Sequence, residues 1–158
     1  MATKRNYNGV QINPSPTIVE KAGADIADVR NRIMKYDENG CVVLAAAGSD
    51  MPVGVAIIEA GYNDITGFES GKAMPGDDID IVIKEMTVVL TGAAIKKGQE
   101  VAAGADGLAV PAVGGNYVIG IALDNAETDE YLSIQIAKYY KPGPTVSTEQ
   151  MEEEEGEF

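Results

Sequence analysis

The sequence predicts an all-β domain, either a small β-barrel or a two-sheet β domain, with an internal duplication and an extended N-terminal arm. Three observations favour this fold class. Short apolar runs rich in Val and Ile alternate with turn residues along the 158-residue chain, which contains 18 glycines and 7 prolines. No long stretch shows the 3.6-residue apolar period of an amphipathic helix. Four turn and strand features occur twice in the same order, as expected for a repeated unit.

The first half of the chain predicts an arm followed by strands. Residues 1–22 contain Asn, Gly and Pro at positions that interrupt regular structure, with apolar residues between them. This pattern fits an extended arm on another surface or a disordered tail. A hairpin is expected around Asn39-Gly40, because Asn-Gly between apolar runs favours a tight turn. The expected strands of this half cover residues 32–36, 41–44, 53–58, 80–84 and 87–90.

The second half repeats this order. Asp106-Gly107 corresponds to Asn39-Gly40, and Gly120 corresponds to Gly54, whose place inside a strand indicates a close backbone approach or a bulge. We therefore expect residues 23–141 to contain two copies of one β unit, at about 23–86 and 87–141. Reuse of similar turns by unrelated β units is the alternative. The apolar runs of this half lie in residues 95–101, 105–110, 118–123 and 131–136.

The charge of the chain limits its partners. The net charge is −13, and six of the 25 acidic residues lie in the last twelve positions. Residues 142–158 are therefore expected to form a solvated acidic tail. The body is acidic as well, so we expect no nucleic acid partner, which would require a basic face. We expect no membrane partner either, because no apolar run approaches the ~20 residues of a membrane-spanning helix.

The sequence indicates no catalytic centre. It has no His and a single Cys, Cys41, which argues against histidine-based triads and the commonest zinc sites. Acidic clusters at 77–80 and 124–130 precede strands, where acids commonly mark turns, and they lack the spacing of a calcium loop. We expect no catalytic residue, no metal and no cofactor, and hence no enzyme. Cys41 is expected to be a small apolar strand residue.

Four stretches of the second half resemble the capsid cement, or head decoration, proteins of tailed bacteriophages. These stretches are a turn over 94–99, a hairpin over 106–112, a strand over 119–123 and a final strand after an acidic turn over 129–136. The resemblance covers the second half well and the first half more loosely, through the apparent duplication. It implies a small β protein without catalytic residues.

The resemblance also implies a place in the virion. Such a protein binds the major capsid protein on the outer surface of the head, often as a homotrimer, stabilises the shell, and is assembled in the host cytoplasm. The alternatives are a non-catalytic β-domain carrier or accessory subunit of an enzyme complex, and a subunit of a surface fibre. The arm residues expected to contact a partner are Tyr7, Val10, Ile12, Pro14, Ile18 and Val19.

Overall fold

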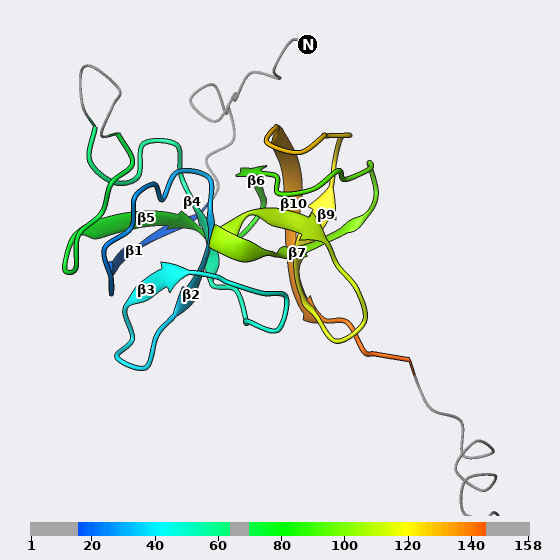
Figure 1. The fold of residues 1–158 in the computed structure, drawn as a ribbon, viewed down its shortest axis with the longest axis horizontal. Coiled ribbons are helices and arrows are strands. Elements are labelled where there is room, and N and C mark those ends of the chain that lie inside the picture. Colours follow the sequence, from blue (N-terminus) through cyan, green and yellow to red (C-terminus); the bar gives the residue numbers. More distant parts are fainter. Residues whose placement is uncertain (1–15, 64–69, 145–158) are drawn as a thin grey trace, which may run out of the picture.

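The computed structural model describes residues 16–63 and 70–144, which form two antiparallel five-stranded sheets (Figure 1). The all-β, two-sheet prediction is confirmed. The first sheet contains β1 (Thr17–Lys21), β2 (Ile33–Tyr36), β3 (Val42–Leu44), β4 (Gly54–Ala56) and β5 (Asp78–Val82). The second contains β6 (Met86–Leu90), β7 (Glu100–Ala103), β8 (Ala109–Pro111), β9 (Tyr117–Ala122) and β10 (Tyr131–Tyr140), with a 3₁₀ turn, η2 (Ala105–Gly107), before β8.

The two sheets have the same strand order. The first runs β1-β5-β4-β2-β3 and the second runs β6-β10-β9-β7-β8, so the strands correspond one to one in chain order. In each sheet, the residue after the first strand forms a parallel bridge to the third strand, Ala22 to Val42 and Thr91 to Ala109. These bridges join the two edges and curl each sheet toward a small barrel. The shared topology supports the duplication, which unrelated strand orders would contradict.

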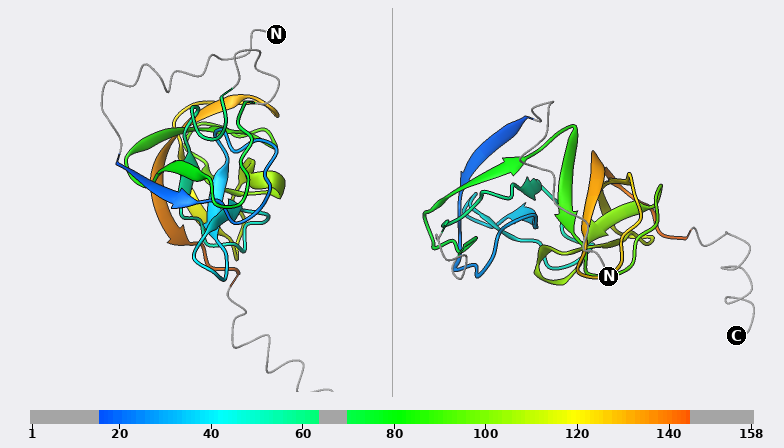
Figure 2. Two further views of the ribbon diagram at one scale, coloured as in Figure 1. Left: turned by 90° about the vertical axis from the view of Figure 1, so that its left-hand side faces the viewer. Right: turned by 90° about the horizontal axis from the view of Figure 1, so that it is seen from above.

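We call residues 16–83 the first unit and residues 86–144 the second unit. The right-hand view of Figure 2 shows them side by side along the long axis of the molecule, the first unit coloured blue to green and the second green to orange. The turns before β5 and β10 are built alike. The Asp77 carboxylate accepts the N–H of Met74 at 2.8 Å, and the Glu130 carboxylate accepts the N–H of Glu127 at 2.9 Å. An acidic side chain that binds the backbone in this way fixes a turn.

The predicted hairpin at Asn39-Gly40 is confirmed. Strands β2 and β3 pair antiparallel, and Gly40 has a φ of 77°, which suits a glycine in a tight turn. The corresponding connection between β7 and β8 contains Asp106 and Gly107, with φ values of 56° and 68°. Both units therefore use a left-handed backbone at the same place in the fold.

A glycine in β4 and another in β9 permit close contact with the neighbouring backbone. A Cβ atom on Gly54 would lie 2.1 Å from the carbonyl oxygen of Val82 in β5. A Cβ atom on Gly120 would lie 2.3 Å from the carbonyl oxygen of Gln135 in β10. The close backbone approach expected at Gly54 is therefore confirmed, and Gly120 repeats it.

Strands β2 and β4 are buried on both faces. Ile33 and Val55 pack into a core that includes residues of the second sheet, whereas Met34 and Ala56 pack into the core of the first unit. Successive side chains of a strand point to opposite faces, so such strands lie between two apolar layers. The first sheet thus contributes to two cores, one of which joins the units.

Asn31 connects the two units from a fully buried position. Its side-chain amide donates to the carbonyl oxygen of Val88 at 2.9 Å, and its own carbonyl accepts the N–H of Leu90 at 3.0 Å. Both groups belong to β6, so Asn31 covers the edge of that strand where a further strand would otherwise pair. Asn31 has a φ of 56°, a conformation that Asn tolerates better than most residues.

The predicted arm over residues 1–22 is too long. Thr17–Lys21 form β1, which pairs antiparallel with β5, and Pro16 accepts the N–H of Ile83 at 3.1 Å. The apolar positions at the end of the predicted arm therefore belong to an edge strand of the first sheet. Residues 1–15 of the arm and residues 145–158 of the predicted tail lie outside the described residues.

We predict that Gly54→Ala and Gly120→Ala each lower the free energy of unfolding by about 1–3 kcal/mol, because the added methyl group forces apart two paired strands. Gly143→Ala is the control, since a Cβ atom there meets nothing within 4 Å. Chemical denaturation measures all three. If Gly54→Ala and Gly120→Ala unfold like Gly143→Ala, the close contacts do not exist.

Candidate docking surfaces

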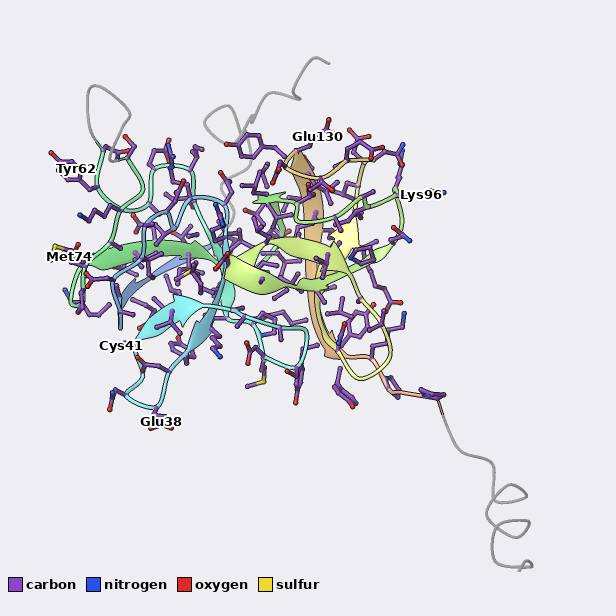
Figure 3. The ribbon with its side chains drawn as sticks, in the orientation of Figure 1. Glu38, Cys41, Tyr62, Met74, Lys96 and Glu130 are labelled. Atoms are coloured by element: carbon purple, nitrogen blue, oxygen red, sulfur yellow. The ribbon has the colours of Figure 1, made fainter. Side chains whose placement is uncertain are left out.

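The cysteine and the charged side chains labelled in Figure 3 do not gather at one place. Figure 3 shows Cys41 and Glu38 near the hairpin between β2 and β3, and Lys96 and Glu130 on the second unit. Cys41 is partly buried, and its N–H donates to the Asp37 carboxylate at 3.0 Å. Within residues 16–63 and 70–144, no three His, Cys, Asp or Glu side chains gather in a way that could hold a metal ion. Within these same ranges, no helix has the length and apolar character needed to cross a bilayer.

The structure separates the two predicted arm residues that it describes. Ile18 packs partly against the core of the first unit and also lines an open groove, so its contact with a partner stays a prediction. Val19 points to the opposite face of β1 and is 57% exposed, so it is available to a partner. The other predicted contact residues, Tyr7, Val10, Ile12 and Pro14, lie outside the described residues.

The outer edge of β1 has no neighbouring strand in the described part of the chain. Ala22 donates its N–H to Asp77 at 2.8 Å, and Pro16 accepts the N–H of Ile83, so even-numbered residues bond toward β5. In an antiparallel ladder, the backbone groups of alternate residues point to the same side. The N–H and C=O groups of Thr17 and Val19 and the N–H of Lys21 therefore point outward, and the bridge between Ala22 and Val42 closes the edge beyond them. They form a template for pairing with another strand.

An open groove of about 620 Å³ lies next to β1, at the junction of the two units. Ile18 of β1 and Ile83 after β5 form one part of its wall, and the loop over residues 45–53 contributes Met51, which is 69% exposed. Sequence reasoning missed this groove. The signal was present as the apolar run Met51-Pro52-Val53, but its exposure depends on how the loop packs.

An ion pair and a hydrogen bond from a lysine hold the loop at the rim of the groove in place. The Lys35 ammonium lies 3.0 Å from the Asp50 carboxylate, and the Lys138 ammonium donates to the carbonyl of Val53 at 2.8 Å. Burial raises the pKa of Asp50, but the N–H of Ala46 and the Lys35 ammonium outweigh this effect and hold the pKa below its ordinary value. The loop is thus tied to both β2 and β10.

The second unit carries a polar and aromatic cluster where β7 begins and β10 ends. The Tyr139 hydroxyl donates to the Glu100 carboxylate at 2.6 Å, and the Lys141 ammonium lies 2.9 Å from the same carboxylate. The rings of Tyr117 and Tyr140 pack nearby, with centroids 5.2 Å apart at an angle of 60°. Glu100 begins β7 as Ile33 begins β2, so the second unit places a charge where the first buries an apolar side chain.

We predict that Glu100→Gln lowers the pKa of Tyr139. The hydrogen bond to Glu100, with burial and the carboxylate charge, raises the pKa of Tyr139 from 10.0 to about 12. Because the pKa is raised, this contact stabilises the folded chain below pH 10, and the contribution is lost as the pH rises through about 12. Titration of ¹³C-labelled tyrosine by NMR, with Tyr139→Phe to assign the signal, measures the shift. An unchanged pKa in Glu100→Gln contradicts the contact.

Comparison with known proteins identifies a similar fold. No family model matches the chain, and no curated protein matches it. Among solved structures, the N base of the head fiber gp8.5 from bacteriophage phi29 is similar, with a TM-score of 0.55 and 20% sequence identity. The match covers 78% of this chain and 95% of that chain. The two-sheet fold of this chain is therefore similar to that of the base of a phage head fiber.

Proposed function

We propose that this chain is a structural protein of a phage head, bound to the outer capsid surface. The observation that carries the proposal is the fold shared with the N base of the phi29 head fiber, which extends over 95% of that base. The resemblance of the second half to capsid cement proteins supports the same location. In this role the protein belongs to the virion, has the major capsid protein as its partner, and catalyses nothing.

The architecture suits a contact role. The two units share one buried core, and the loop beside the groove is tied to β2 and β10 by Lys35 and Lys138. A platform that is already ordered loses little conformational entropy when it binds. The open edge of β1 and the groove supply backbone and apolar contacts on one side of this platform.

Two finer roles are compatible with this location. A cement protein that binds only the assembled shell stabilises it by mass action, and many weak copies on one particle act together. The resemblance of the second half favours this role, which we place first. The similarity to the base of a head fiber favours the second role, that of a fibre subunit.

Purified protein added to heads that lack it is expected to bind saturably and to keep DNA inside the heads at higher temperature. Co-sedimentation measures binding, and nuclease sensitivity of the packaged DNA after heating measures stability. Electron microscopy separates the two roles, because cement forms a low layer and a fibre projects. Absence of binding to any intact head overturns the head proposal, whereas binding without protection leaves the fibre role.

We predict that a chain beginning at residue 16 binds heads at least tenfold more weakly than the full chain. Removal of residues 1–15 takes away Tyr7, Val10 and Ile12, and each buried apolar side chain contributes about 1.5–3 kcal/mol. A chain ending at residue 144 is the matched control, because it loses 14 mainly polar and acidic residues. Equal binding by both truncated chains contradicts a contact role for the arm.

A further inference from the structure

We propose that residues 8–12 of one copy of this chain add a strand to the open edge of β1 in a second copy. The acceptor consists of the outward N–H and C=O groups of Thr17 and Val19 and the outward N–H of Lys21, up to the point where the bridge between Ala22 and Val42 closes the edge. Val19 is 57% exposed on the sheet face beside these groups. An edge that offers both backbone groups and an apolar side chain is suited to pairing with an extended segment.

The second unit shows how this edge is covered within one chain. Strand β6 occupies the same place in the second sheet as β1 in the first. Its outward groups on Val88 and Leu90 bond to Asn31, at 2.9 Å and 3.0 Å. The corresponding groups of β1 belong to Val19 and Lys21, and they have no such cover among the described residues. The repeated fold therefore leaves one of two equivalent edges open.

Residues 8–12 have the sequence of a strand that fits this edge. They read Asn-Gly-Val-Gln-Ile, so Val10 and Ile12 lie on one face of an extended segment, and both are β-branched. This face can meet Val19. The acidic C-terminal segment is a poor alternative, because four consecutive glutamates from Glu152 to Glu155 repel one another and have low strand propensity.

The sequence between residues 8–12 and β1 disfavours a tight return to the same chain. Asn13 and Ser15 each precede a proline, and the residue before proline avoids the helical region of φ and ψ. A type I turn over Pro14 and Ser15 needs that region at Ser15, and a type II turn needs a positive φ there, which serine disfavours. A tight hairpin back onto the chain's own β1 is therefore disfavoured. The proline-rich sequence therefore favours pairing of residues 8–12 with another copy over pairing with their own edge.

Substitution of Val19 tests the acceptor edge. Val19→Pro removes only an outward N–H, because the bonds to β5 come from even-numbered residues, and proline is tolerated on edge strands. Val19→Thr keeps the N–H and the β-branched shape and is the control. We expect the full chain and Val19→Thr to form oligomers in light scattering and Val19→Pro to be a monomer of 16.6 kDa, with unchanged circular dichroism.

The donor segment is tested outside the folded units. Val10→Pro with Gln11→Pro removes backbone donors from both edges of the segment and is expected to give monomers, whereas Thr3→Pro is expected to leave the oligomer intact. A full chain that is monomeric at every concentration overturns the proposal, as does an oligomer that survives both Val19→Pro and the double proline variant. These measurements need no capsid, so they stand apart from the test of head binding.

Crosslinking identifies the chain that supplies the strand. In a Cys41→Ser background, a Val10→Cys chain is mixed with a Val19→Cys chain and treated with a short bismaleimide. A covalent dimer is expected, because the two sites meet only between copies. Val113→Cys, at a side chain that is 62% exposed on the second unit, replaces Val19→Cys as the control. A single chain with both Val10→Cys and Val19→Cys is the comparison. A link that forms within this chain but not between the two mixed chains shows that the segment folds back, and overturns the proposal.

Discussion

Burial of strands β2 and β4 on both faces is the constraint on which the rest of the structure depends. Ile33 and Val55 supply part of the core of the second unit, while Met34 and Ala56 on the same strands fill the core of the first. Neither unit can be removed without exposing apolar surface of the other. Asn31 adds buried hydrogen bonds at the same junction, and these are costly to break because its partners would be left unsatisfied.

The differences between the two units are located where their surroundings differ. Ile33 begins β2 and is buried at the junction, whereas Glu100 begins β7 and forms a partly exposed ionic contact with Lys141. A charged residue at this position does not offer the apolar contact that Ile33 offers to the second unit. Polar outer faces end other repeat proteins in the same way. The same position of the fold is thus buried between the units in the first unit and partly exposed in the second.

Local chemistry explains which features could be predicted from the sequence. The hairpin at Asn39-Gly40 and the close contact at Gly54 follow from what a glycine permits, so a few neighbouring residues were sufficient. The sequence of β1 looks like part of the arm because its partner, β5, lies far along the chain. The packing of Ile18 against the first unit is hidden for the same reason. The groove beside Met51 arises when β1, β2, the residue after β5 and the loop over residues 45–53 come together with Lys138 of the second unit, which no local pattern reveals.

The acidity of the chain limits how its copies can associate. With a net charge of −13, copies repel one another at a distance, and salt screens this repulsion beyond about 8–10 Å. Attraction between copies must therefore come from short-range contacts. Backbone hydrogen bonds at an open strand edge satisfy this requirement, because they depend on alignment rather than on charge. The open edge of β1, with Val19 beside it, is therefore a surface on which two acidic copies can associate without a basic patch.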